Sequence, residues 1–393
     1  MSERQFSFDI IAEDPVTHAR AGVFHTPHGD VPTPIFMPVG TKATVKGLLP
    51  DQLKAIGTAE VVPAIFNINE PLIFGAPVVL HLSQRPGADL IEDMGGLHTF
   101  MRWDGPILTD SGGFQIFSHG EFVQLADDGV TFRTVDYDGS YVHWSPADNM
   151  RIAQQLGADI VMQLDQCPPY PAERHFVERA VELSGLWAER CRAAHTRKDQ
   201  ALFGIVQGGV HMDLRLRSLS YLEACGGFPG YGIGGYSVGE DHSTMFETLA
   251  PLASEHMPRE KPRYLMGVGN PTTLVHGVEC GIDMFDCVLP TRTARMGCAF
   301  TGQGRVNLRH AAHTHSHDPL DPDCACPVCT GGYTRAYLHH LVRQREMVGS
   351  ILLSLHNLHY LLDLMRRARQ AIMEGRYGEF VSAWGDLPAA NDW

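Results

Sequence analysis

Short apolar runs recur along most of the chain, and they constrain its fold more than any other feature of the sequence. Each run is only a few residues long and ends near a glycine, a proline or a polar residue. Nearly continuous apolar runs of this length are typical of strands buried on both faces of a parallel sheet. About eight are present, at residues 34–40, 59–65, 106–110, 159–165, 202–207, 230–235 and 264–268 and from Met284 onward.

Helical patterns separate several of these runs. Ser145-Pro146-Ala147-Asp148 predicts the start of one helix, because serine is a favoured N-cap, proline suits the first helical position and an acidic residue suits the first turn. Gly157 predicts where that helix ends. The alternation of strand and helix predicts an α/β protein with a (β/α)8 TIM barrel, and a doubly wound sheet is the alternative. Helical spacing also covers residues 172–195, 211–225, 241–254 and 271–280.

Two segments interrupt the alternation. Residues 117–144 have strand character, and Asp138-Gly139 is a hairpin-turn signal. Residues 298–333 are rich in glycine, histidine, cysteine and proline, which predicts a small inserted unit. We therefore expect a barrel over residues 1–297, the inserted unit over 298–333 and C-terminal helices that close the barrel over 334–393.

Composition limits the classes of protein to which the chain can belong. With 44% hydrophobic and 19% charged residues it can bury a large core and is not disordered. The sequence has no apolar run long enough to span a membrane and no signal peptide, which predicts a cytoplasmic protein. There, the nine cysteines are expected to be free thiols or metal ligands rather than disulfides.

The charge is unevenly distributed. The net charge is −14, yet residues 292–345 contain seven arginines and three acidic residues. A basic region on an acidic protein is typical of an enzyme that holds a polyanion at one place, and a solvated arginine-rich surface is the alternative.

The predicted strands end in polar residues. Active sites of TIM barrels lie at the carboxyl ends of the strands, and carboxylates gathered there are costly to desolvate unless they have a function. Each aspartate could instead only cap the helix that follows. The residues at these ends are Asp110, Asp165, Gln207, Gly235, Met266 and Asp286.

The segment after Asp110 is more specific. Gly112-Gly113 allows a tight turn and a close approach to a ligand, although it could also be a simple corner between strand and helix. Phe114 offers a flat face on which a planar base could stack.

Cys324, Cys326 and Cys329 place three thiols within six residues. His356 is the candidate fourth ligand, although spacing alone also allows His339, His340 and His359. Three sulfurs and one imidazole form a closed tetrahedral set, which is typical of structural rather than catalytic zinc. The histidines at 313, 315 and 317 are better explained as a solvated loop.

In its motifs the sequence resembles a bacterial-type tRNA-guanine transglycosylase, of the queuine tRNA-ribosyltransferase family. The resemblance covers nearly the whole chain and several motifs in the same order. The matching segments are 36–41, 108–115, 204–208, 238–240, 264–269, 285–292 and the set of three cysteines and a histidine.

The resemblance implies an irregular barrel with an inserted zinc-binding subdomain and a double-displacement reaction. Guanine at the wobble position of tRNA would be exchanged for a 7-deazaguanine. Asp286 matches the nucleophile that attacks ribose C1′, and Asp110 matches the general acid/base. Further matches are Asp165, Gln207, Gly235 and Tyr236 around the base, Phe114 and Met266 as walls of the base sandwich, and Arg292 and Arg295 against the anticodon loop.

The sequence departs from the family pattern in three places. Residues 63–80 are longer than and different from the usual Asn-Thr-Tyr-His-Leu region, and they are expected beside Asp110. Leu164-Asp165-Gln166 replaces Phe-Asp-Glu, and Tyr236-Ser237-Val238 replaces Leu-Ala-Val. The backbone of 236–237 is expected to face the 7-substituent of the base. Cys167 and Val238 keep the bacterial pattern, which favours 7-aminomethyl-7-deazaguanine over queuine.

The resemblance also implies the partners. These are the tRNAs for Asn, Asp, His and Tyr, which carry a U-G-U anticodon-loop sequence, and a second copy of the chain in a homodimer. A catalytically weakened zinc-containing tRNA-binding homologue is an alternative that the presence of both Asp110 and Asp286 disfavours. A barrel hydrolase acting on carbohydrates would explain the carboxylates but not the arginines or the cysteines.

Overall fold

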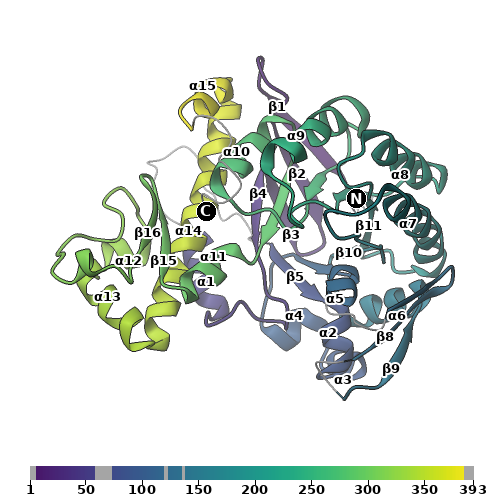
Figure 1. Cartoon of the computed structure of the whole chain (residues 1–393), viewed down its shortest axis with the longest axis horizontal. Helices are drawn as coiled ribbons and strands as arrows, with labels where there is room; N and C mark the ends of the chain where they lie inside the picture. The colour runs from purple at the N-terminus through teal and green to yellow at the C-terminus, as the bar shows by residue number, and fades with distance from the viewer. Residues whose placement is uncertain (1–5, 58–72, 119–122, 135–137, 385–393) are drawn as a thin grey trace.

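The computed structural model describes residues 6–57, 73–118, 123–134 and 138–384. Eight parallel strands form its central sheet, with helices around it (Figure 1). The strands are β4 (Ile35–Pro38), β5 (Phe74–Val78), β6 (Ile107–Asp110), β10 (Ile160–Met162), β11 (Ala201–Val206), β12 (Tyr231–Ile233), β13 (Arg263–Leu265) and β14 (Met284–Cys287).

The sheet closes on itself. Strand β14 pairs with β4, and a parallel bridge between Val39 and Gly75 joins β4 to β5. The Gly40 amide donates to the Gly75 carbonyl at 2.9 Å across this seam. Closure confirms the predicted TIM barrel and excludes the doubly wound alternative, whose sheet would have two open edges.

One of the eight predicted strands, the apolar run at 59–65, lies outside the described residues. In chain order the second strand of the described barrel is Phe74–Val78, which the sequence patterns did not predict as a strand. This strand contains Ala76 at φ +48° and shifts register between Gly75 and Val78, so it is irregular. Val78 lies opposite Asp110, so the divergent stretch does reach the neighbourhood expected for it.

An N-terminal antiparallel sheet fills one end of the barrel. It consists of β1 (Phe8–Glu13), β2 (Arg20–Thr26) and β3 (Gly29–Thr33). Phe8, Phe24 and Val31 pack in one buried cluster with inward residues of the barrel such as Leu108 and Met284. The sequence patterns did not predict this sheet, a plug whose apolar side chains pack against the interior at one end of the barrel.

Helices surround the barrel as the sequence patterns indicate. Helix α6 begins with a complete capping box between Ser145 and Asp148 and ends at Gly157, which has φ +71°. The helices of this part are α1 (Pro50–Gly57), α2 (Val79–Gln84), α3 (Ala88–Asp93), α4 (Gly96–Met101), α5 (Gly113–Ser118), α6 (Pro146–Leu156), α7 (Arg174–Ala194), α8 (Met212–Ala224), α9 (His242–Pro251) with the π-helical turn Leu252–His256, α10 (Pro271–Glu279) and α11 (Leu289–Arg295).

The segment between β6 and α6 forms a second small antiparallel sheet. Its strands are β7 (Gln124–Ala126), β8 (Gly129–Arg133) and β9 (Tyr141–Trp144). Arg133 pairs with Tyr141, and the Gly139 amide donates to the Thr134 carbonyl, which confirms the hairpin predicted around Asp138-Gly139.

The C-terminal part projects to one side of the barrel and returns to it (Figure 1). It contains β15 (Cys298–Thr301), β16 (Gly304–Asn307), a 3-10 turn (Ala311–His313), α12 (Pro327–Thr330), α13 (Arg335–Gln344), α14 (Met347–Met373) and α15 (Tyr377–Ser382). The long helix α14 packs against α11, β15 and β4, so it joins this part to the barrel. No helix within the described ranges is both long and apolar enough to cross a membrane.

A buried ion pair fastens the N-terminal plug to the barrel. Arg20 donates two hydrogen bonds to Asp283, at 2.9 and 2.5 Å, and both side chains are almost fully buried. Asp283 also accepts the Arg263 amide at 2.7 Å, just before strand β14 begins. Removing one partner of such a pair leaves an uncompensated buried charge.

We expect Arg20→Met to lower the free energy of unfolding by about 3–5 kcal/mol, because Asp283 loses its partner. Arg259→Ala is the matched control, since Arg259 pairs with Glu13 at the surface and its side chain is 71% exposed; it should cost about 1 kcal/mol or less. Chemical denaturation of both variants measures the difference, and equal losses would contradict the assigned role of the buried pair.

Candidate active site and metal centre

Two aspartates project into the same end of the barrel because of strand alternation. Leu108 and Met284 point inward and belong to the interior cluster. Asp110 and Asp286 lie two residues further along the same strands and therefore point the same way. Both stand at the carboxyl end of the barrel, opposite the N-terminal plug.

Asp286 is held by two donors on one oxygen. The Tyr264 hydroxyl donates to Oδ1 at 2.7 Å, and the Gly267 amide donates to it at 2.8 Å. Burial raises the pKa of Asp286, and these two hydrogen bonds act against that rise. Among the described residues no hydrogen bond to Oδ2 is recorded. The carboxylate is thus oriented, kept closer to its ionised form and left with one oxygen for chemistry.

Asp110 has a different environment. Burial, together with the charges of Asp165 and Asp286, raises the pKa of Asp110 to about 7. The Ser111 amide and the Gln115 side chain oppose the rise. At neutral pH Asp110 therefore exists in both protonation states, which is the condition for a group that gives and takes a proton.

Asp165 completes the acidic group at the barrel mouth. The Gln207 side chain donates to its Oδ2 at 2.6 Å, and the Ser111 hydroxyl lies 3.5 Å from its Oδ1. Burial raises the pKa of Asp165 to about 6 in spite of these bonds. Within the described part of the chain, Gln207 Oε1 is buried without a partner, so it is free to accept a hydrogen bond from a ligand.

Two glycines bring the backbone close to these side chains. A Cβ atom on Gly113 would lie 2.6 Å from the Asp165 carbonyl and carboxylate oxygens. One on Gly235, which has φ +71°, would lie 2.4 Å from Gln207 Oε1. A larger residue at either place would push apart the groups that line the pocket.

The remaining predicted pocket residues lie at the same end. Phe114 is 49% exposed at the start of α5, and Met266 directly follows β13 and packs on the barrel interior. Tyr236 is near the pocket only through its backbone. Its side chain turns into the core, where its hydroxyl lies 2.6 Å from that of Thr248.

Arg292 and Arg295 are exposed on α11, which follows β14 directly. They are three residues apart and so share one face of the helix. Burial lowers the pKa of Arg295, and the charge of Arg292 adds to this effect. Two like charges held side by side next to an acidic mouth favour a polyanion as their counterpart.

Three residues of this site were given no role by the sequence analysis. Tyr264 and Gly267 orient Asp286, and Arg215 lies fully buried beneath Gln207 and Gly235. Tyr264 could have been found, because it points into the barrel one strand away from Asp286. Arg215 carried no signal, since an arginine in a helical pattern is normally exposed.

The three predicted cysteines and His356 gather in one cluster. Distances from His356 Nδ1 to the sulfurs of Cys324, Cys326 and Cys329 are 3.7, 3.4 and 3.4 Å. Ligands of one tetrahedral zinc lie about 3.5 Å apart. His356 Nε2 lies 2.6 Å from the Phe300 carbonyl, which leaves Nδ1 free to bind metal. The cluster fits a metal ion, and of the four histidines that spacing allowed it selects His356.

The metal cluster is linked to the helix that carries the arginines. Asn357, next to His356, is fully buried and donates to the carbonyls of Pro290 and Cys298 at 2.9 and 3.1 Å. It also accepts the Phe300 amide at 2.9 Å. A metal that fixes α14 thereby fixes the position of α11 as well.

A second group of possible ligands, at the plugged end, does not fit a metal. His28 and His98 both approach the Asp159 carboxylate, at 2.7 and 3.1 Å. Their rings stack 3.6 Å apart, whereas two imidazoles on one tetrahedral ion diverge. The distances and the stacking are those of a carboxylate that accepts two histidine N–H groups.

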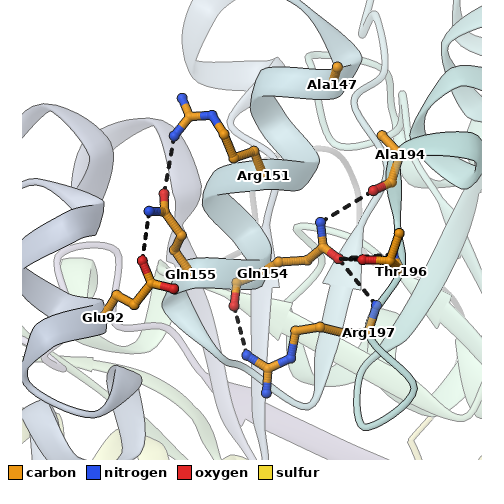
Figure 2. Close-up of a pocket in the computed structure, with 8 residues that line it drawn as sticks. All are labelled: Glu92, Ala147, Arg151, Gln154, Gln155, Ala194, Thr196 and Arg197. Carbon is orange, nitrogen blue, oxygen red and sulfur yellow. Dashed lines mark hydrogen bonds between the residues drawn. The ribbon is translucent and has the colours of Figure 1, made fainter.

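A surface hollow between α3, α6 and residues 194–197 is also not the site. Figure 2 shows that its polar side chains bind one another. Gln155 bridges Arg151 and Glu92, and Gln154 binds Arg197 and Thr196. The hollow therefore offers little unused hydrogen-bonding capacity to a ligand.

Comparison with known proteins gives one consistent result. A family model described as "Queuine tRNA-ribosyltransferase" matches residues 14–386. A protein of that name from Halothermothrix orenii is 50% identical over 377 residues, which are 95% of each chain. Another from Bacillus subtilis is 48% identical over 381 residues, covering 97% of this chain and 95% of the relative.

We expect Cys326→Ala to lower the bound metal from about one ion per chain to well below that value, and to lower the melting temperature, because one of four ligands is lost. Cys280→Ala is the matched control, since it removes another buried thiol outside the cluster. Elemental analysis of the purified variants measures the effect. Unchanged metal content in Cys326→Ala would contradict the assignment.

Proposed function

The chain belongs to the queuine tRNA-ribosyltransferase family, and from this premise we propose that it exchanges guanine at the wobble position of tRNA for a 7-deazaguanine by double displacement. It is an enzyme of the pentosyltransferase class, which acts as a tRNA-guanine transglycosylase in the queuosine pathway. The observation that carries the mechanism is the difference between two neighbouring carboxylates, Asp286 oriented by two donors and Asp110 with a pKa of about 7.

In the first displacement, Asp286 attacks ribose C1′ through its unoccupied oxygen. The C1′–N9 bond breaks, guanine leaves with the bonding electrons, and Asp110 gives it a proton. In the second displacement, Asp110 takes the proton from N9 of the incoming base, N9 attacks C1′, and the bond to Asp286 breaks. Two inversions retain the configuration at C1′, as in a retaining glycosidase.

The base is proposed to lie between Phe114 and Met266, with its polar edge toward Asp165, Gln207 and Gly235. Support comes from the exposed face of Phe114 and from the buried, unpaired oxygen of Gln207. An aromatic face gains stacking energy with a planar base, and a carboxylate accepts the N–H groups of a guanine-like edge.

The incoming base is proposed to be 7-aminomethyl-7-deazaguanine. Support comes from the resemblance, because Cys167 and Val238 keep the bacterial pattern and Val238 implies the narrower pocket; an aminomethyl group is far smaller than the side chain of queuine. The same exchange with queuine is the alternative, and assays with both bases side by side distinguish them.

The tRNA is proposed to be held by Arg292 and Arg295 on α11, with the target base flipped out of the anticodon loop into the barrel mouth. The substrates would be the tRNAs for Asn, Asp, His and Tyr, which carry U-G-U in that loop. The exposure of both arginines beside the mouth supports this.

The metal is proposed to be one structural zinc ion on Cys324, Cys326, Cys329 and His356, because this donor set is closed and thiolate-rich. It would brace α14 and, through Asn357, α11. We also propose a cytoplasmic homodimer, which sedimentation of the purified protein would test.

Asp286→Asn should lower guanine exchange into unmodified tRNA by about three orders of magnitude or more, because an amide cannot form the covalent intermediate. Tyr264→Phe is the graded comparison. It keeps the nucleophile but loses one donor, so it should cost about tenfold. Incorporation of labelled guanine measures both, and full activity of Asp286→Asn would refute the proposed nucleophile.

Guanine release in a single turnover should slow by about tenfold per pH unit above pH 7, because the fraction of protonated Asp110 falls at that rate. At low pH the rate should fall again as Asp286 becomes protonated. Asp110→Asn should lose the alkaline limb together with most of the rate. A wild-type rate that rises through pH 8 would contradict the assignment of the acid.

A further inference from the structure

We propose that Tyr236 is a positioning residue that sets base selectivity. Its side chain ties the backbone of residues 234–237 to Arg215 and Thr248, and this fixes the pocket wall that meets the 7-substituent. The inference rests on the proposed function in one respect, that the base lies against this wall.

Tyr236 has two specific contacts inside the core. Its ring lies under the Arg215 guanidinium, with 3.7 Å from Cζ to the ring centroid. Its hydroxyl lies 2.6 Å from Thr248 Oγ1 on α9, and Thr248 in turn can donate to the Met245 carbonyl. The Tyr236 side chain is only 4% exposed, so it can influence the pocket only through direct contacts in the core.

Arg215 connects this ring to the backbone on either side of the pocket. It donates to the carbonyls of Val206 and Gly234 at 2.9 and 2.6 Å, and to that of Gly209 at 2.8 Å. Val206 ends strand β11 just before Gln207, and Gly234 follows β12 just before Gly235. One buried cation thus sets the spacing of the two strand ends that carry pocket residues.

The backbone after Gly234 needs such support, because it is not in a relaxed conformation. Gly235 and Ser237 have φ values of +71° and +61°, and the left-handed region is unfavourable for serine. On the outer side of this turn, the Glu240 carboxylate accepts the amides of Ser237 and Val238. On the inner side, Tyr236 is the anchor.

The turn borders the groups assigned to base recognition. Gly235 packs so tightly on Gln207 Oε1 that a Cβ would lie 2.4 Å away, and Gln207 binds Asp165. A movement of this turn therefore changes the wall near the base. Asp286 lies on β14, and its donors are Tyr264 on β13 and Gly267 just after β13, so none of the three belongs to this turn.

The expected consequence is a selective loss. Both bases present the same polar edge to Gly235 and Gln207, but only 7-aminomethyl-7-deazaguanine has a 7-substituent that also reaches the backbone of residues 236–237, so it should lose more. Loss of the contacts of Tyr236 with Arg215 and Thr248 should raise KM for 7-aminomethyl-7-deazaguanine and leave proton transfer by Asp110 unchanged.

The test compares Tyr236→Leu, Tyr236→Phe and Thr248→Val with the full-length wild type. Tyr236→Leu loses both contacts, and it should raise KM for 7-aminomethyl-7-deazaguanine by about tenfold more than it raises KM for guanine. Tyr236→Phe and Thr248→Val each remove one partner of the same hydrogen bond, so they should have equal, smaller effects that do not add in the double variant.

The outcomes separate the inference from the proposed function. If wild type exchanges neither base, the proposed function fails. If wild type exchanges both and Tyr236→Leu keeps its discrimination, or loses kcat equally for both, only the role of Tyr236 is refuted. An unchanged pH profile of kcat in Tyr236→Leu is required, because a shifted profile would mean that the variant disturbs Asp110 or Asp286.

Discussion

Desolvation of three carboxylates in one barrel mouth is the constraint on which the site depends. Burial alone would push Asp110, Asp165 and Asp286 toward their neutral forms, and the charges of the other two raise the pKa of Asp110 further. Hydrogen bonds then separate their roles. Two donors on one oxygen favour the ionised form of Asp286, Gln207 holds Asp165, and Asp110 retains a pKa of about 7. When the environment favours the ionised form of one carboxylate and the protonated form of the other, the two can act as nucleophile and acid in one reaction.

The rest of the fold keeps these groups in place. The N-terminal sheet packs against the interior of the barrel at the far end and is fastened there by Arg20 and Asp283. At that mouth, α11 carries two arginines, and Asn357 fixes this helix to α14 beside the metal ligands. An acidic protein can in this way present a local cationic surface next to its own carboxylates.

Much of this organisation could be read from the sequence. Strand and helix alternation predicted the barrel, the ends of the predicted strands located Asp110 and Asp286, and dense thiols indicated the metal cluster. Contacts between residues far apart in the sequence could not be predicted from it. The strand Phe74–Val78 was not predicted, because it contains proline and glycine and its pairing depends on closure of the barrel. Arg215 was overlooked because nothing local marks a buried cation, and Tyr236 appeared as a pocket residue because its side chain's direction depends on Arg215 and Thr248.

The most direct measurement is to locate the covalent intermediate. The protein is mixed with unmodified tRNA without a replacement base, quenched in denaturant, digested with nuclease and protease, and analysed by mass spectrometry. We predict one modified peptide, with the ribose remnant on Asp286, in a denaturation-resistant adduct that disappears when the replacement base is added before quenching. A remnant on Asp110, or exchange without any adduct, would contradict the division of roles between the two carboxylates.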